Sequence, residues 1–417
     1  MSIARWFYVC AFLGIFVAAQ AFGGGFQLNE HGARGMAQAG AFAARATDGS
    51  AIFYNPAGLG FQTQASVYLG ATVIVPTGSF YGPLQDNTNA KTDNKQLVFT
   101  PINAYVVVPA MDRLTVGVGV MNPYGLGTEW DANWAGRFLS VKVDLKSFYF
   151  TPTVSYRLTD QLSIGAGFSY VTGSVLLTKK VPVPVGIADP TTGSNLAEPL
   201  VSLDLTGTGT GWTAGILYKF TPSLSVGLSY RSAVKMDASG TASFTPNYAA
   251  LDLPAGDASV SIKLPATSFA GVAYRINDAL EVEADFQYIW WSSYDQLKVD
   301  FKADGSSSIS PKNYKDTYIA RVGGEYSLGD LKIRGGYYFD HSPVDDSHLE
   351  PMLPDADRHG LNIGFGYQIT KHINVDVSYL FIKFLDRQAV NTIPQIAFDG
   401  TYRTTVNLFG LDLGYTF

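Results

Sequence analysis

The chain has 417 residues, with 43 glycines, 24 tyrosines and 26 phenylalanines, and only 15% of its residues are charged. Soluble domains average about 25% charged residues, so this aromatic-rich and charge-poor composition is atypical of them, and it excludes a disordered chain. The formal net charge of −6 opposes binding to a phosphate backbone. We therefore expect no nucleic acid partner.

The N-terminus has the pattern of a signal peptide. Arg5 precedes an apolar stretch over residues 6–18, and Ala19-Gln20-Ala21 follows with the small-x-small pattern that signal peptidase recognises. We predict that residues 1–21 are removed and that the mature chain begins at Phe22. Cys10 is the single cysteine, so the mature chain would have no thiol for a disulfide, a metal site or a nucleophile.

Residues beyond 62 alternate between apolar and polar side chains with a period of two, which is typical of β-strands with two different faces. Between residues 280 and 290, for example, apolar side chains occupy one face while Glu281, Glu283 and Asp285 occupy the other. A soluble sandwich and an outer-membrane barrel both produce this alternation. The pattern predicts an all-β fold and leaves its environment open.

The connections between the expected strands differ in length in a regular way. Six tight turns alternate with seven long polar loops, among them 76–96 and 238–257, and these thirteen connections imply 14 antiparallel strands. The chain ends in alternation up to Phe417, which resembles the C-terminal recognition signal of bacterial outer-membrane proteins. We predict a 14-stranded transmembrane β-barrel over residues 63–417. The expected strands are 64–75, 97–109, 113–121, 142–157, 161–178, 206–219, 223–236, 258–276, 279–300, 314–328, 331–340, 359–370, 372–385 and 401–417.

Residues 22–62 do not alternate and are rich in glycine and alanine, so they are poorly suited to a strand at a lipid surface. With both termini on the periplasmic side, a segment of this size can fold into the barrel lumen. We predict an N-terminal hatch, or plug, over residues 22–62. Within it, Pro56 favours an extended backbone at Asn55, whose amide can bond nearby main chain, so Asn55-Pro56-Ala57 is expected to form a turn.

An ordered set of motifs runs through the chain. It comprises Gly25-Phe26-Gln27-Leu28-Asn29-Glu30, Asn55-Pro56-Ala57, Pro123 to Trp130, Trp291 to Tyr294, Phe339 to Val344 and Pro354 to Arg358. This set resembles the FadL family of outer-membrane long-chain fatty acid and hydrocarbon transporters, and the resemblance covers essentially the whole mature chain. It implies a 14-stranded barrel closed by a hatch, passive uptake of hydrophobic molecules, and lateral release through a gap at a kinked third strand.

The long loop over residues 122–140 carries apolar side chains spaced by two and four positions, which suits one or two amphipathic helices. These residues are Tyr124, Leu126, Trp130, Trp134 and Phe138. The resemblance implies that this loop captures the ligand first. The alternative is that the aromatic side chains only pack the loop onto the barrel rim.

A second ligand site is expected in the lumen under the hatch. Its candidate residues are Phe26, Leu28, Phe53 and Tyr54, beside the turn residues Asn55, Pro56 and Ala57. A carboxylate headgroup would pair with a cation, and a loose match to the family's headgroup contacts indicates Lys179 and Lys312. The alternatives are that the apolar residues only seat the hatch and that most lumen cations balance lumen carboxylates.

The resemblance assigns the lateral gate to the third strand, where Gly117 and Gly119 lack side chains and would permit a kink. They can equally be ordinary lumen glycines. The acidic residues between 340 and 357 suit a solvated loop, with calcium binding as the alternative, and we assign no metal site. The histidines form no Ser/His/Asp arrangement, so we expect no enzyme; an outer-membrane lipid hydrolase is the enzymatic alternative.

The sequence thus predicts a bacterial outer-membrane protein, without cofactors, that takes up long-chain fatty acids by facilitated diffusion. The expected partners are a long-chain fatty acid or another hydrophobic small molecule, lipopolysaccharide and outer-membrane lipid, and the barrel-assembly machinery. The protein is expected to be a monomer. A channel for monoaromatic or other hydrocarbons is the main alternative, and a general porin is less favoured.

Overall fold

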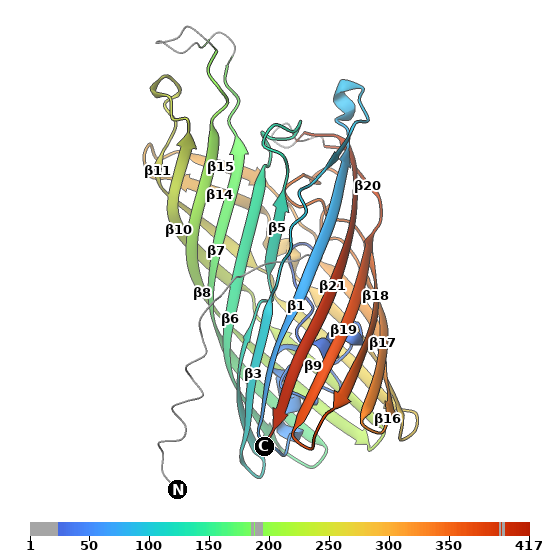
Figure 1. Cartoon of the computed structure of the whole chain (residues 1–417). Helices are drawn as coiled ribbons and strands as arrows, with labels where there is room; N and C mark the ends of the chain where they lie inside the picture. The colour runs from blue at the N-terminus through green and yellow to red at the C-terminus, as the bar shows by residue number, and fades with distance from the viewer. Residues whose placement is uncertain (1–23, 185–186, 188–194, 392, 394–396) are drawn as a thin grey trace.

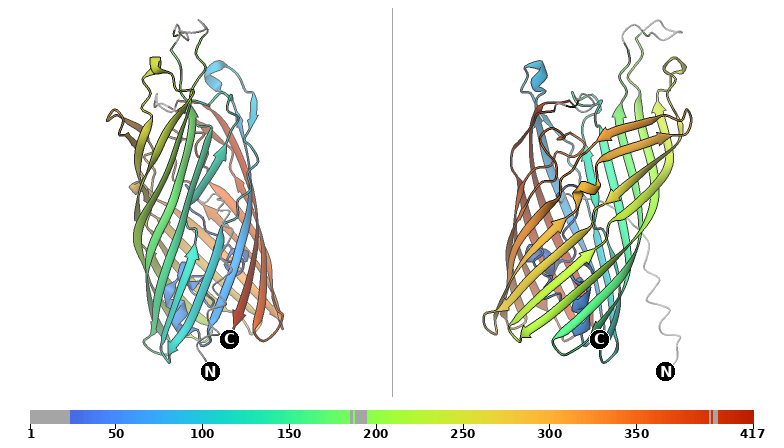
Figure 2. Two further views of the ribbon diagram at one scale, coloured as in Figure 1. Left: turned by 60° about the vertical axis from the view of Figure 1, so that its left-hand side comes forward. Right: turned by 180° about the vertical axis from the view of Figure 1, so that it is seen from behind.

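The computed structural model describes residues 24–184, 187, 195–391, 393 and 397–417. The predicted signal peptide, residues 1–21, and Phe22 lie outside this described part. Tilted strands form a tall barrel, with the short turns and the C-terminus at its lower end and the longer connections at its upper end (Figures 1 and 2).

No helix in the described ranges is both long enough and apolar enough to cross a membrane.

The strands pair in one antiparallel sheet that closes on itself. Closure is made by β1 and β21, which pair from Ser66 with Thr416 to Tyr81 with Thr401. The described part of the chain contains 21 strand segments: β1 Ser66–Tyr81, β2 Lys91–Asp93, β3 Ile102–Met111, β4 Leu114–Met121, β5 Gly125–Glu129, β6 Lys142–Arg157, β7 Leu162–Lys180, β8 Leu200–Thr221, β9 Leu224–Arg231, β10 Val234–Thr245, β11 Gly256–Leu264, β12 Thr267–Arg275, β13 Leu280–Ile289, β14 Gln296–Phe301, β15 Ser307–Pro311, β16 Thr317–Leu328, β17 Leu331–Asp340, β18 Arg358–Gln368, β19 Ile373–Phe384, β20 Arg387–Ala389 and β21 Gly400–Thr416.

These segments build the predicted barrel of 14 strands. Four of its strands are interrupted: β4 continues as β5, β9 as β10, β11 as β12, and β13 as β14 after the 3₁₀ turn η5, Trp291–Ser293. The prediction of 14 antiparallel strands is therefore confirmed, while the prediction of unbroken strands over 223–236, 258–276 and 279–300 was wrong.

Several predicted strand ends were also wrong. The loop expected over 238–257 contains much of β10, because its side chains continue to alternate between buried and exposed and its backbone pairs with β8 and β11. The strand expected to stop at residue 75 runs through Pro76 to Tyr81. Pro76 is tolerated because β3 pairs with β1 only as far as Ala71, so the ladder needs no N–H on that side of residue 76.

The two faces of each strand differ as a transmembrane barrel requires. On β21, Phe409, Leu411 and Leu413 are 52%, 57% and 51% exposed, while Gly410 and Asp412 between them are buried on the lumen side. In a soluble sandwich the apolar face would be covered by a second sheet. An exposed apolar belt on the outer face indicates that lipid covers the barrel.

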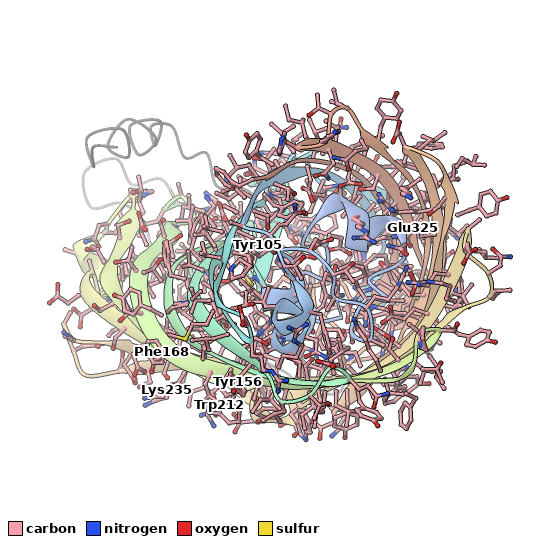
Figure 3. The ribbon with its side chains drawn as sticks, turned by 90° about the horizontal axis from the view of Figure 1, so that it is seen from below. Tyr105, Tyr156, Phe168, Trp212, Lys235 and Glu325 are labelled. Atoms are coloured by element: carbon pink, nitrogen blue, oxygen red, sulfur yellow. The ribbon has the colours of Figure 1, made fainter. Side chains whose placement is uncertain are left out.

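The N-terminal segment, residues 24–62, lies inside the lower part of the barrel, and the view from below shows its helices within the ring of strands (Figure 3). Its helices are α1 Ala33–Ala37, α2 Ala51–Tyr54 and the 3₁₀ helix η2 Pro56–Phe61. Wall glycines let its backbone approach closely. A Cβ atom on Gly227 would lie 2.0 Å from the Ala43 oxygen, and one on Gly165 would lie 2.4 Å from the Pro56 carbonyl carbon.

Candidate functional site

One end of the N-terminal segment is a strap, Gly24–Leu28, that crosses the lumen. At its start, the N–H groups of Gly24 and Gly25 each donate to a carboxylate oxygen at 3.1 Å, of Asp340 and Asp355 respectively. Both carboxylates are buried and pair with the buried Arg358. The acidic stretch expected to be solvated therefore holds the strap through charge-assisted hydrogen bonds.

The rest of the acidic stretch is also engaged in ion pairs. Asp346 accepts from Arg387 at 2.8 Å, and Asp345 lies 2.7 Å from His348. The prediction of a solvated acidic loop over 340–357 was wrong for Asp340, Glu350 and Asp355, which are buried in ion pairs with basic residues, whereas the Asp346 side chain is 66% exposed. Within the described residues, no cluster of three or more His, Cys, Asp or Glu side chains could hold a metal ion.

The other end of the strap covers the break between β4 and β5. Gln27 pairs with Tyr124, the Leu28 N–H donates to the Pro123 oxygen at 2.8 Å, and the Gly125 N–H donates to the Phe26 oxygen at 2.9 Å. The β3–β4 ladder ends at Ala104 and Val120. The Pro123 oxygen and the Gly125 N–H are therefore bonded from inside the barrel by the strap, whereas the backbone N–H and oxygen of Tyr124 are bonded by the Ser147 hydroxyl of β6.

The predicted gate glycines lie below this interruption. Gly117 and Gly119 are paired on both sides, with β3 and with β6. A Cβ atom on either residue would come within 3.2 Å of the Ile52 side chain of the N-terminal segment. The absence of a side chain at these two positions allows the wall and the N-terminal segment to pack closely. The strand itself breaks higher up, at Asn122–Tyr124, where Pro123 has no N–H to donate to a neighbouring strand.

Asn122 bridges the break. Its side-chain oxygen accepts from the Ile102 N–H at 3.0 Å, and its amide donates to the Ser147 oxygen at 2.7 Å. Sequence reasoning missed this residue, because an Asn before Pro is typical of any turn. The long-range contacts to two wall strands are not encoded by local spacing.

The aromatic residues of the predicted capture loop are largely inside the protein. Trp130 and Trp134 stack with ring centroids 4.3 Å apart, and their indole N–H groups donate to the Pro351 and Ser140 oxygens. Tyr124, Leu126, Trp130 and Trp134 are buried, and Phe138 is half-buried beneath the Arg137 guanidinium. The expected amphipathic helix is absent from residues 122–140, which are all described, and β5 occupies part of its place.

Tyr124 belongs to an aromatic cluster in the middle of the lumen. Phe26 contacts it at 6.2 Å between ring centroids, and Phe26 also contacts Trp291 at 4.7 Å and Tyr294 at 5.3 Å. The Tyr124 hydroxyl donates to the Pro265 oxygen at 2.7 Å, at the break between β11 and β12. The strap is therefore packed between two interruptions of the wall that face each other across the lumen.

An apolar cavity of about 480 Å³ lies above this cluster, at the upper end of the barrel. Its walls come from β6, β7, β8, β10, β14 and β15. Most of the lining is aliphatic or aromatic, including Val201, Leu203, Phe244, Leu297 and Val299. Its charged members are Lys142, Lys179 and Glu350, and four hydroxyl side chains, Ser140, Thr178, Ser308 and Ser310, also line it. Such a volume and lining suit the alkyl part of a hydrophobic ligand.

The two predicted headgroup lysines approach each other at this cavity. Lys179 lines it, whereas Lys312 is buried behind it and forms an ion pair with Glu350. Burial and the nearby Lys179 ammonium lower the pKa of Lys312 to about 7. Glu350 was missed as a site residue, because it lies 38 residues from Lys312 in the sequence. When Lys312 is protonated, Lys179, Lys312 and Glu350 together carry one net positive charge. This charge can pair with an anionic headgroup.

The other predicted lumen residues lie lower and hold the N-terminal segment to the wall. The buried Asn55 amide donates to the Ala43 and Ile216 oxygens, and its oxygen accepts from the Ala57 N–H at 3.1 Å. Ser229 and Arg231 of the wall donate to the backbone oxygens of Tyr54 and Phe53. Phe53 and Tyr54 are buried against wall and segment, and they do not line the apolar cavity.

Comparison with known proteins identifies the family. Residues 14–417 match the outer membrane protein transport protein family, OMPP1/FadL/TodX. The chain belongs to this family. It is 27% identical to the long-chain fatty acid transport protein of Shigella flexneri, and the alignment covers 96% of each chain. Like other family members, it is an outer-membrane protein.

Two solved structures of the family share the fold. A FadL homologue from Pseudomonas aeruginosa superposes with a TM-score of 0.83 at 23% identity, covering 94% of this chain and 99% of that one. The toluene transporter TbuX of Ralstonia pickettii gives a TM-score of 0.71 at 21% identity, with the same coverage. At these identities the likeness establishes the barrel architecture and does not select a ligand.

Proposed function

We propose that the protein takes up long-chain fatty acids or similar hydrophobic molecules by passive transport across the outer membrane. The apolar cavity beside Lys179 carries this proposal. A carboxylate headgroup would lie at the Lys179 ammonium, and the alkyl chain would lie along Leu203, Phe244 and Val299. Burial of a long alkyl chain contributes roughly 0.8 kcal/mol per CH₂ group, so the cavity favours an amphiphile over a small polar solute.

The structure also suggests a route out of the cavity. We propose that residues 24–62 act as a hatch and that the strap leaves the interruption at Asn122–Tyr124 during transport. The strap is held there by two backbone hydrogen bonds and by aromatic contacts. Because the interruption lies within the wall, its opening would let an apolar ligand pass laterally into lipid without entering water.

Capture at the outer surface is a separate part of the proposal. Phe138, the half-buried member of the loop over 122–140, and the mouth of the cavity at Leu139 and Ser140 are next to each other in the sequence. We propose that a ligand first meets this rim. The buried residues Tyr124, Leu126, Trp130 and Trp134 support the loop from below.

Equilibrium binding to the purified, detergent-solubilised protein tests the ligand class. Oleate should bind saturably, and Lys179→Ala should weaken it while leaving toluene binding unchanged. Lys142→Ala is a matched control, since Lys142 also lines the cavity but its ammonium is paired with Glu129 at 2.7 Å. Toluene binding that oleate does not displace would refute the fatty acid assignment.

A hydrocarbon channel is the second candidate, and one observation favours it. Lys312 is paired with Glu350 and Lys142 with Glu129, so Lys179 is the one cation among the described lining residues that has no carboxylate partner, in a mostly apolar lining. A neutral monoaromatic molecule would need no cation. Equal oleate affinity in the wild-type protein and in Lys179→Ala would support this candidate.

The remaining functional assignments stay proposals. We propose that the protein is not an enzyme, since it belongs to a family of transport proteins. We also propose that it is a monomer, that the barrel-assembly machinery inserts it with both termini in the periplasm, and that it contacts lipopolysaccharide. Chemical crosslinking in intact outer membranes tests the monomer, and a crosslinked homodimer would refute it.

A further inference from the structure

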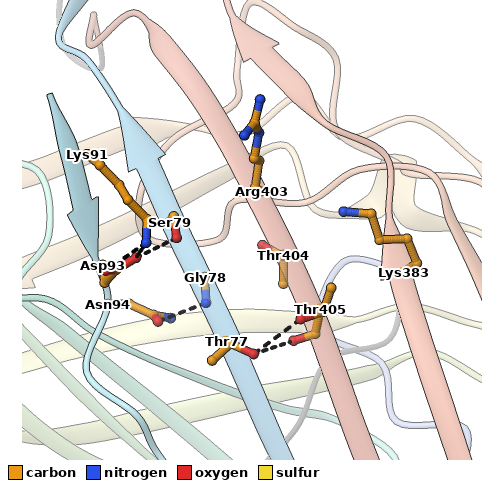
Figure 4. A pocket seen from close by; sticks show the side chains of 10 residues that line it. All are labelled: Thr77, Gly78, Ser79, Lys91, Asp93, Asn94, Lys383, Arg403, Thr404 and Thr405. Carbon is orange, nitrogen blue, oxygen red and sulfur yellow. Dashed lines mark hydrogen bonds and ion pairs between the residues drawn. The ribbon is translucent and has the colours of Figure 1, made fainter. Parts of the chain in front are cut away.

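A polar hollow of about 370 Å³ lies on the outer face of the barrel, over β1, β2, β19 and β21 (Figure 4). Its cations come from three separate elements: Lys91 from β2, Lys383 from β19 and Arg403 from β21. Figure 4 shows Lys91 on one side of the hollow and Lys383 on the other, with Arg403 between them. Residues distant in the sequence thus bring positive charge to one external spot.

These cations are exposed and keep hydrogen-bond donors to spare. The side chains of Lys91, Lys383 and Arg403 are 50%, 47% and 52% exposed. Lys91 pairs with Asp93 at 2.8 Å, while Arg403 and Lys383 share Asp386 at 2.8 and 3.5 Å. Three cations thus face two carboxylates, and each ammonium has three N–H donors and the guanidinium has five.

Hydroxyl groups complete the lining. Thr77 and Thr405 lie with their hydroxyl oxygens 3.2 Å apart, and the Ser79 hydroxyl donates to Asp93 at 2.6 Å. Hydroxyl groups beside cations suit a ligand that carries both sugar hydroxyls and phosphate oxygens, since hydroxyls donate and accept. The lining is therefore better suited to a phosphorylated sugar than to a bare alkyl chain.

The hollow lies directly above the lipid-facing belt. Lys383 pairs with Thr405 in the β19–β21 ladder. Tyr379 pairs with Phe409 in the same ladder, four residues closer to the lower end of the barrel and on the same outward face. The Tyr379 and Phe409 rings contact each other at 5.1 Å, and Phe409 belongs to the exposed apolar belt together with Leu411 and Leu413. A molecule in the hollow would have its attached acyl chains against this belt.

We propose that this hollow binds the phosphorylated sugar headgroup of an anionic glycolipid of the outer leaflet. The phosphate contacts Lys383 and Arg403, with Lys91 on the far side, and the acyl chains lie along Phe409 and Val73. Such a lipid is bound at the wall and is not the transported molecule. The glycolipid site is separate from the apolar cavity. An experiment that refuted glycolipid binding would therefore leave the proposed transport function unaffected.

The test is retention of glycolipid by the purified, folded barrel, measured by native mass spectrometry in buffer containing EDTA to remove divalent cations. The probes are lipopolysaccharide, its enzymatically dephosphorylated form and inorganic phosphate. We expect about a tenfold loss of lipopolysaccharide affinity in the triple variant Lys91→Gln/Lys383→Gln/Arg403→Gln, and weak binding of the dephosphorylated lipid. Inorganic phosphate at millimolar concentration should not compete, because it lacks the acyl chains.

Lys298→Gln is the matched control, since Lys298 forms a similar exposed pair with Asp300 at 2.7 Å on another strand of the outer surface. It should retain lipopolysaccharide like the wild type. Equal retention by the triple variant, equal binding of the dephosphorylated lipid, or full competition by inorganic phosphate would each overturn the proposal. An unchanged heat-dependent shift in electrophoretic mobility would show that every variant is folded.

Discussion

The lower and upper parts of the lumen are built on different chemistry. In the lower part, the N-terminal segment is bound by charges: Glu283 and Asp285 of β13 accept backbone N–H groups of residues 42–44 at 2.6 to 3.0 Å, and Glu283 pairs with Arg45 at 2.8 Å. A second network joins Arg34 and Arg334 to Glu325. In the upper part, the apolar cavity has few polar groups on its lining.

This difference separates anchoring from ligand binding. Buried charge networks are directional and costly to break, because each group left behind is unpaired in a low-dielectric interior. Apolar contacts are not directional, so a cavity lined with them accepts alkyl chains in several positions. We infer that the charge networks keep the bulk of the N-terminal segment and the start of the strap in place, while the end of the strap at the β4–β5 break, Phe26–Leu28, which two backbone hydrogen bonds hold to the wall, is the part that moves.

The largest expected effect comes from breaking the lower network. Glu283→Gln would leave the buried Arg45 without its main partner and should cost about 3 kcal/mol of stability. Thermal unfolding followed by electrophoretic mobility measures this loss, and ion conductance in planar bilayers would rise as the hatch loosens. Glu281→Gln is the control, because Glu281 is more exposed and lies 3.9 Å from Arg45. Equal effects of the two variants would contradict a specific anchor.

A smaller effect is expected from the upper part. Lys179→Ala should weaken oleate binding about tenfold, as expected for one hydrogen bond to a charged group, with little change in thermal stability. Titration of the purified protein with oleate measures the affinity. A loss of stability as large as that of Glu283→Gln would mean that the two parts of the lumen do not differ in the way described.

The smallest effect concerns pH. Since burial and Lys179 lower the pKa of Lys312 to about 7, Lys312 is charged below pH 7 and neutral above it. Binding of a long-chain alkyl sulfonate, whose own charge is constant over this range, should therefore be about threefold tighter at pH 6 than at pH 8.5. Lys312→Met should abolish the dependence. A persistent pH dependence in this variant would assign the titration to another group.

The barrel was predictable because alternation gives each strand an apolar and a polar face, as at Phe409 to Leu413, and because short turns alternate with long loops, which distinguishes a transmembrane barrel from a soluble sandwich. The interruptions were not predictable in the same way. The break at Pro123 depends on the strap that bonds it from inside, and Tyr124 reaches Pro265 across the lumen. These contacts join residues far apart in the sequence, and periodicity within one strand carries no information about them.

The sequence predicted some residues of the candidate site, but it did not predict how they are arranged or which residues pair with them. Lys179 and Lys312 do meet at one cavity, yet the partner Glu350 comes from a stretch that looked solvated. Trp130 and Trp134 looked like an exposed capture surface because their spacing suits an amphipathic helix. Their burial depends on Phe80 and Phe398, which contact Trp134 from β1 and from the segment before β21.

Movement of the strap is the central claim, and a reversible crosslink tests it most directly. Gln27 and Tyr124 are paired opposite each other between two flanking backbone hydrogen bonds, where opposing Cα atoms are about 4.5 Å apart, close enough for a disulfide. The double variant Gln27→Cys/Tyr124→Cys should take up radiolabelled oleate when reduced and lose uptake when oxidised, while oleate binding persists. Full uptake by the oxidised protein would contradict release past the strap at the β4–β5 break.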